Sequence, residues 1–72
     1  MVRNERDNLK MLLNYWIAHN QDHGIEFKEW AEKAKAMGEQ QVADDILRAV
    51  TEMEKATVLF SKSLKNLSTG GK

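Results

Sequence analysis

Apolar residues recur every three or four positions over most of this chain. That spacing places them on one face of an α-helix and is typical of heptad repeats. The chain contains no proline and only four glycines, so few residues interrupt a helix. We therefore expect an all-α protein. In the first half the expected row consists of Leu9, Leu13, Trp16, Asn20, His23, Phe27, Trp30, Ala34 and Met37, widened by Leu12, Ile17 and Ala31.

The first helix is predicted to cover about residues 5–37, with Asn4 as its N-cap. Gly24 lies inside this span, but the apolar row keeps its phase on both sides of it, which favours one continuous helix. A break near Gly24 would instead give a three-helix bundle. Gly38, directly after the last residue of the row, is a signal for the helix C-terminus.

The second helix is predicted to cover about residues 40–67, and residues 68–72 are expected to form a frayed tail. The whole chain, 1–72, is expected to form one domain. The apolar row of the second helix consists of Val42, Ile46, Ala49, Val50, Met53, Thr57, Phe60, Leu64 and Leu67.

The short connection predicts two antiparallel helices packed as a hairpin. Facing residues then have numbers that sum to about 77, which brings Trp16 opposite Phe60 and Asn20 opposite Thr57. A lone hairpin leaves apolar residues outside its inner face, so we expect a homodimer that closes into a four-helix bundle. The residues expected on the oligomer surface are Leu12, Ile17, Leu47, Val58 and Leu59.

Composition argues against several classes of function. Acidic and basic residues number 11 each, so the chain lacks the positive charge typical of a nucleic-acid binder. No uncharged run is long enough to span a membrane, and no signal peptide is evident. These features predict a cytoplasmic protein. The chain has no cysteine nucleophile and no glycine-rich phosphate loop, so we do not expect an enzyme.

The polar residues near the middle of the first helix have two interpretations. His19, His23 and Glu26 fall on one helix face, where two imidazoles and a carboxylate can bind a divalent transition metal such as nickel, cobalt or zinc. In the other interpretation, Asn20, His23 and Thr57 form a polar core layer that fixes helix register and oligomeric state. A histidine-based pH switch is a third hypothesis.

The block from Leu13 to Ala34 resembles a small helical domain of unassigned function from bacteria and archaea, in the run hWIxHNxxHxxEFxxWAxxA. The resemblance covers residues 9–67. It implies an association with small nickel-binding proteins of the CooT type and makes His19, His23 and Glu26 the candidate ligands. The family pattern leads us to expect alanine where this chain has Gly24.

From the sequence we predict a small, non-enzymatic helical module for assembly or interaction with a protein partner. The alternative is a metal-binding accessory protein that uses the His-x3-His-x2-Glu face.

Overall fold

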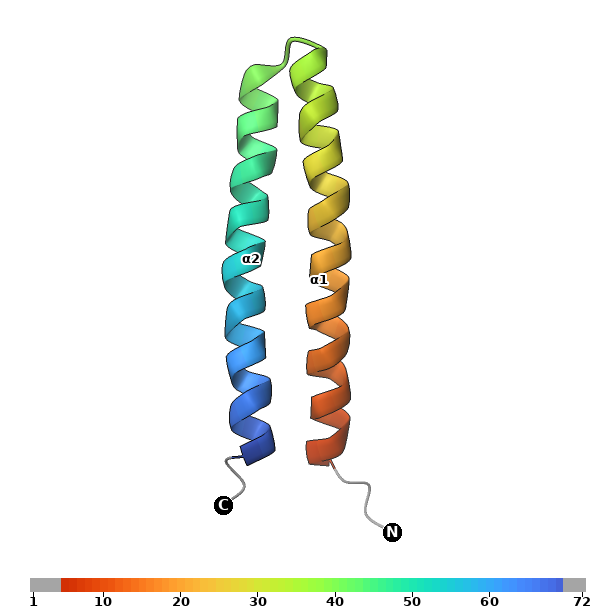
Figure 1. Cartoon of the computed structure of the whole chain (residues 1–72), viewed down its shortest axis with the longest axis vertical. Coiled ribbons are helices and arrows are strands. Elements are labelled where there is room, and N and C mark those ends of the chain that lie inside the picture. The colour runs from red at the N-terminus through yellow and green to blue at the C-terminus, as the bar shows by residue number, and fades with distance from the viewer. Residues whose placement is uncertain (1–4, 70–72) are drawn as a thin grey trace.

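The computed structural model describes residues 5–69, with the side chain of Thr69 left out, and consists of two long helices. Helix α1 covers Glu5–Ala36 and helix α2 covers Gln40–Thr69. They lie side by side in opposite directions as an elongated hairpin of 57 × 21 × 11 Å (Figure 1). The predicted all-α hairpin is confirmed. Asn4, the predicted N-cap, and residues 70–72 of the predicted tail lie outside the described residues.

The helix boundaries agree with the prediction to within two residues. Helix α2 continues through Ser68 and Thr69, which were expected to belong to the tail. Helix α1 runs through Gly24 without interruption, so the alternative with three helices is wrong. Among residues 5–69, neither helix combines enough length with enough apolar character to cross a membrane.

The turn between the helices is fixed by backbone hydrogen bonds. The N–H of Glu39 donates to the carbonyl of Ala34 (2.9 Å), and the N–H of Gly38 donates to the carbonyl of Lys35 (2.9 Å). This pair of bonds is the Schellman motif, which needs a left-handed residue directly after the helix. Gly38 supplies that residue with φ of +84°. The carbonyl of Glu39 accepts the first bond of α2, from the N–H of Ala43, so the chain reverses within three residues.

The two helices meet along a contact line that we call the seam, formed by most of the buried or half-buried residues of α1 and α2. His23, Leu47 and Ala56 are also half-buried but lie beside this line. In α1 the seam consists of Lys10, Leu13, Ile17, Asn20, Gly24, Phe27, Ala31 and Ala34, and in α2 of Ala43, Ile46, Val50, Met53, Thr57, Phe60, Leu64 and Leu67. The seam of α1 therefore differs from the predicted row at every second position, where the residue in contact with α2 is the next one along the chain.

Residue size explains the displacement. The tightest part of the seam lies near the turn, where Ala31, Ala34 and Ala43 are almost completely buried. Only small side chains fit between helices that a three-residue turn holds this close. Trp30, predicted to face α2, lies beside the seam and is 51% exposed.

The register of the hairpin agrees with the prediction. The rings of Trp16 and Phe60, a predicted facing pair, have centroids 5.7 Å apart. At the open end, the Arg6 guanidinium donates to the carbonyl of Leu67 at 3.2 Å. These contacts show that the two helices stay paired over their whole described length.

Candidate functional site: a histidine pair on an apolar face

One broad side of the hairpin carries large apolar residues from α1 and small residues from α2. We call it the aromatic face. At 100° per residue, its positions fall beside the seam on the same side of the hairpin. Leu9 of α1 and Ser63 of α2 line one groove on this side, together with Phe60. The aromatic face consists of Leu9, Trp16, His23 and Trp30 on α1, Met37 in the turn, and Val42, Ala49, Ala56 and Ser63 on α2.

The large residues of the aromatic face are exposed in the hairpin alone. Trp16 is 36% exposed, and Leu9, Trp30, Met37 and Val42 are more exposed than this. Burying such side chains is the main source of stability for small helical proteins and of affinity at interfaces. The hairpin therefore leaves much of its apolar area uncovered on this side.

The two histidines lie in the middle of this side of α1. His19 and His23 point their Nε2 atoms at one another, 2.9 Å apart. In the neutral state one nitrogen donates a proton to the lone pair of the other. Two imidazole nitrogens at this separation form a bidentate group for a metal ion, which would replace the shared proton.

Neighbouring rings hold both imidazoles in place. Tyr15 stacks on His19 with ring centroids 5.2 Å apart, and Phe27 stacks on His23 at 5.4 Å. The two imidazoles are almost perpendicular to each other, with an interplanar angle of 84°. The four rings form a ladder at steps of four residues along α1, which restricts the rotamers of both histidines.

Glu26 lies on the far side of the His23 ring. Its Oε1 atom is 3.5 Å from Nδ1 of His23, whereas Nε2 of His23 faces His19. A carboxylate at Nδ1 favours the tautomer that leaves the lone pair on Nε2, as in many metal sites. Over the described part of the chain, no three His, Asp or Glu side chains converge on one point where a metal ion could bind. In a single hairpin Glu26 thus orients the His23 ring and does not form a three-ligand metal site with the two Nε2 atoms.

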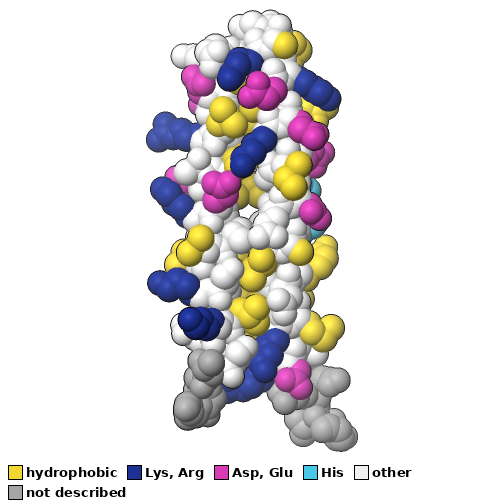
Figure 2. Space-filling view, viewed as in Figure 1, with side chains coloured by type: hydrophobic (Ala, Val, Ile, Leu, Met, Phe, Trp, Pro, Cys, Tyr) yellow, Lys and Arg dark blue, Asp and Glu magenta, His cyan; other side chains and the backbone are white. Residues whose placement is uncertain are grey.

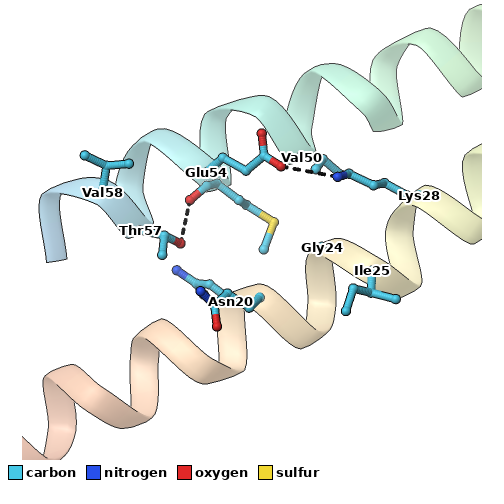
Figure 3. A pocket seen from close by; sticks show the side chains of 10 residues that line it. Asn20, Gly24, Ile25, Lys28, Val50, Glu54, Thr57 and Val58 are labelled. Atoms are coloured by element: carbon cyan, nitrogen blue, oxygen red, sulfur yellow. Dashed lines mark hydrogen bonds and ion pairs between the residues drawn. The ribbon is translucent and has the colours of Figure 1, made fainter. Parts of the chain in front are cut away.

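The predicted polar layer is divided between two sides of the hairpin. Asn20 and Thr57 line an open cavity of about 380 Å³, together with Gly24 and Val50 (Figure 3). Thr57 Oγ1 donates to the carbonyl of Met53 at 2.9 Å. Neither histidine lines this cavity.

The cavity has a charged rim and an apolar floor. An ion pair of 3.3 Å between Lys28 and Glu54 bridges the two helices at its edge, and Ile25 and Val58 flank it (Figure 3). Charged and apolar side chains alternate over this broad side, and histidine is visible only at the edge of α1 (Figure 2).

The residues predicted for the oligomer surface occupy different positions. Leu12 and Leu59 are exposed toward the aromatic face, whereas Val58 is exposed on the cavity side. Ile17 and Leu47 are half-buried, and Leu47 packs against the alanine cluster of the seam.

Sequence reasoning missed two features of the site. The ring ladder follows from the spacing of Tyr15, His19, His23 and Phe27, so the i, i+4 positions contained the signal. The ammonium of Lys33 lies 4.3 Å from the ring centre of Trp30, a cation–π contact that requires Trp30 to be exposed. An apolar row that turns Trp30 toward the second helix does not predict this contact.

A family model for a domain of unknown function, DUF8180, matches residues 9–67. The chain belongs to this family. The match agrees with the predicted resemblance to a small helical family, and the matched DUF8180 region covers most of both helices. The comparisons do not support the expected association with nickel-binding proteins of the CooT type. No curated protein and no solved structure matches the chain.

Proposed function

We propose that this DUF8180 protein is a non-enzymatic assembly module whose aromatic face binds the same face of a second copy to form a four-helix bundle. The observation that carries the proposal is the exposure of Trp16 and Trp30 on one broad side of a hairpin whose own buried core is small, with a cluster of alanines near the turn. Tryptophan is among the side chains most often found as anchors of protein interfaces, and this side of the hairpin has two that are partly exposed.

The dimensions of the hairpin support this assembly. Its broad side measures 57 by 21 Å, which exceeds the roughly 800 Å² that each partner buries in a stable interface. Opposite the large residues of α1, helix α2 presents Ala49, Ala56 and Ser63, whose small side chains allow a second helix to approach closely. Charged side chains stay at the margins, where a bundle keeps them in water.

Sedimentation equilibrium of the metal-free chain tests this proposal. We expect a dimer that dissociates on dilution, and we expect Trp16→Ala/Trp30→Ala to weaken it by at least about 100-fold, because truncating one anchor typically costs 2 kcal/mol or more. Circular dichroism should show that this variant stays helical, because Trp30 lies outside the seam and Trp16 borders it through a single ring contact with Phe60.

The matched control is Met11→Ala/Ile25→Ala, which removes exposed apolar side chains away from the aromatic face. This variant should dimerise like the unmodified chain. A monomeric protein at all concentrations would contradict self-assembly and would make the aromatic face a site for a different protein. Equal weakening by both double variants would also contradict the assignment of the interface.

The second candidate function is binding of nickel, cobalt or zinc as a metal-binding accessory protein. It is favoured by the 2.9 Å separation of the two Nε2 atoms and by the carboxylate at Nδ1 of His23. Isothermal titration of the metal-stripped chain with Ni²⁺ and Zn²⁺ tests it. Binding should disappear in His19→Ala/His23→Ala and persist in Asp22→Ala, a control on the outer side of α1. Heat that is unchanged in the histidine variant would reject this candidate.

A further inference from the structure

The α1 row of the aromatic face is nearly symmetric about His23. Trp16 and Trp30 lie seven residues to either side. Leu9 and Met37, the latter directly after the end of α1, lie seven residues further out. Residues at this spacing follow the contact line between two helices that supercoil to the left. When the α1 helix of a second copy packs antiparallel, with the two-fold axis at His23, Trp16 of each copy lies opposite Trp30 of the other. This register is self-complementary, as an isologous interface requires.

The same register brings a carboxylate to the histidine pair. Glu26 lies three residues after His23, and His19 lies four residues before it. Across the two-fold axis, Glu26 of one copy is therefore nearly level with His19 of the other. Both residues occupy the same margin of the aromatic face at 100° per residue. Within the described residues, a single hairpin has no carboxylate near the two Nε2 atoms, because Glu26 of the same chain lies at Nδ1 of His23. Glu26 of a second copy would supply this carboxylate.

The geometry points to a divalent transition-metal site shared between two copies, with Nε2 of His19 and His23 from one chain and the carboxylate of Glu26 from the other. The two-fold axis repeats the site, and the inference rests on the self-assembly proposed above. Two nitrogens at about 2.0–2.1 Å from one metal ion lie about 2.9 Å apart at an angle of 90° and about 3.3 Å apart at the tetrahedral angle of Zn²⁺. The 2.9 Å observed between the histidines is therefore within about 0.5 Å of either geometry. Two imidazoles and a carboxylate suit Zn²⁺, Ni²⁺ or Co²⁺, with water in the remaining positions.

The structure also accounts for how the ligands become available. The ring ladder already holds both imidazoles in the paired orientation, so little side-chain entropy is lost when a metal binds. When both Nε2 atoms bind the metal, the ring that donated the hydrogen bond carries its proton on Nδ1 instead, so two neutral imidazoles coordinate without a net loss of protons. The side chain of Glu26 is 58% exposed, so it is free to turn from His23 of its own chain to the second copy.

A mixing experiment separates a shared site from a site within one chain. His19→Ala/His23→Ala retains only the carboxylate, and Glu26→Gln retains only the histidine pair. Each variant alone should bind Zn²⁺ or Ni²⁺ at least about 10-fold more weakly than the unmodified chain, because loss even of a residue that only supports a metal ligand costs about 10–100-fold. When the two are mixed and exchange partners, each mixed dimer recovers one complete site, so tight binding should return. A site within one chain cannot be recovered in this way.

Measurements on the unmixed proteins complete the test. Sedimentation in EDTA should show that both variants still dimerise, and Trp16→Ala/Trp30→Ala, which keeps all three ligands, should lose tight metal binding together with the dimer. A dimer that binds no metal, or a mixture that does not recover binding, would overturn the shared site and leave the assembly function intact. Tight binding by a monomeric tryptophan variant would also overturn it. A chain that never dimerises would reject both proposals.

Discussion

Replacing Gly24 by alanine should stabilise the hairpin. Gly24 lies in the seam within a continuous helix, where glycine costs about 1 kcal/mol relative to alanine. A Cβ atom at this position would lie 4.0 Å from Cγ1 of Val50, which is an ordinary van der Waals contact. The new methyl group fits without moving α2, so we expect the free energy of unfolding to rise by about 1 kcal/mol. For a domain of this size that corresponds to an increase in Tm of about 4–8 °C.

Urea unfolding followed by circular dichroism at 222 nm measures this change. The unmodified chain and the variant must be compared at equal concentration, because dimerisation adds a concentration-dependent term to stability. The midpoint should move to higher urea while the m value stays the same, since the same surface becomes exposed.

Gly38→Ala provides the matched control, with the opposite sign. Gly38 has φ of +84°, and a Cβ atom there would meet nothing within 4 Å. The left-handed conformation costs an L-residue about 1–2 kcal/mol, so this variant should be destabilised by that amount. If Gly24→Ala also destabilised the protein, the helices would have to approach more closely at Gly24 than the structure indicates, and our placement of the seam would be refuted.

Two further substitutions test the packing. Ala31→Leu should lower the free energy of unfolding by about 1–3 kcal/mol, because Ala31 is completely buried between the helices, whereas Ala18→Leu on the exposed side should be nearly neutral in the same urea assay; equal effects would argue against a tight alanine seam. A double-mutant cycle on Lys28→Ala and Glu54→Ala should give a coupling free energy below about 1 kcal/mol that decreases with added salt, because both side chains are more than half exposed. A larger coupling free energy that does not change with salt would show that this ion pair is shielded from water and would contradict its position at the exposed rim of the cavity.

The hairpin was predictable because several sequence signals agree. The heptad spacing predicts both helices, and Gly38 predicts the turn together with the register that pairs Trp16 with Phe60. The phase of the seam was harder to predict, because two rows of α1 have almost the same spacing. Hydrophobicity favours the row with Trp16 and Trp30, whereas the structure selects the neighbouring row with Gly24 and Ala31. The short turn allows only small side chains between the helices, and this selects the row with Gly24 and Ala31. The spacing of apolar residues carries no information on side-chain volume.

The candidate site was predictable in part. The spacing of His19 and His23 predicts that their side chains lie together, and their nitrogens are 2.9 Å apart. The position of Glu26 depends on side-chain rotamers, so the sequence pattern could not distinguish a ligand from a residue that orients His23. Within one hairpin Asn20 lies beside Thr57, whereas the shift of the seam places His23 outside their cavity. The role of these residues in fixing register and oligomeric state stays a prediction.

Disulfide trapping tests the central claim, the antiparallel assembly about His23, most directly. The chain has no cysteine, so single cysteines introduced as Leu9→Cys and Met37→Cys report only on the interface. When the two variants are mixed in metal-free buffer and oxidised, our account predicts that the disulfide joins Leu9→Cys of one chain to Met37→Cys of the other. Crosslinks that form within each variant alone, and not between the two, would indicate a parallel arrangement and would contradict the account.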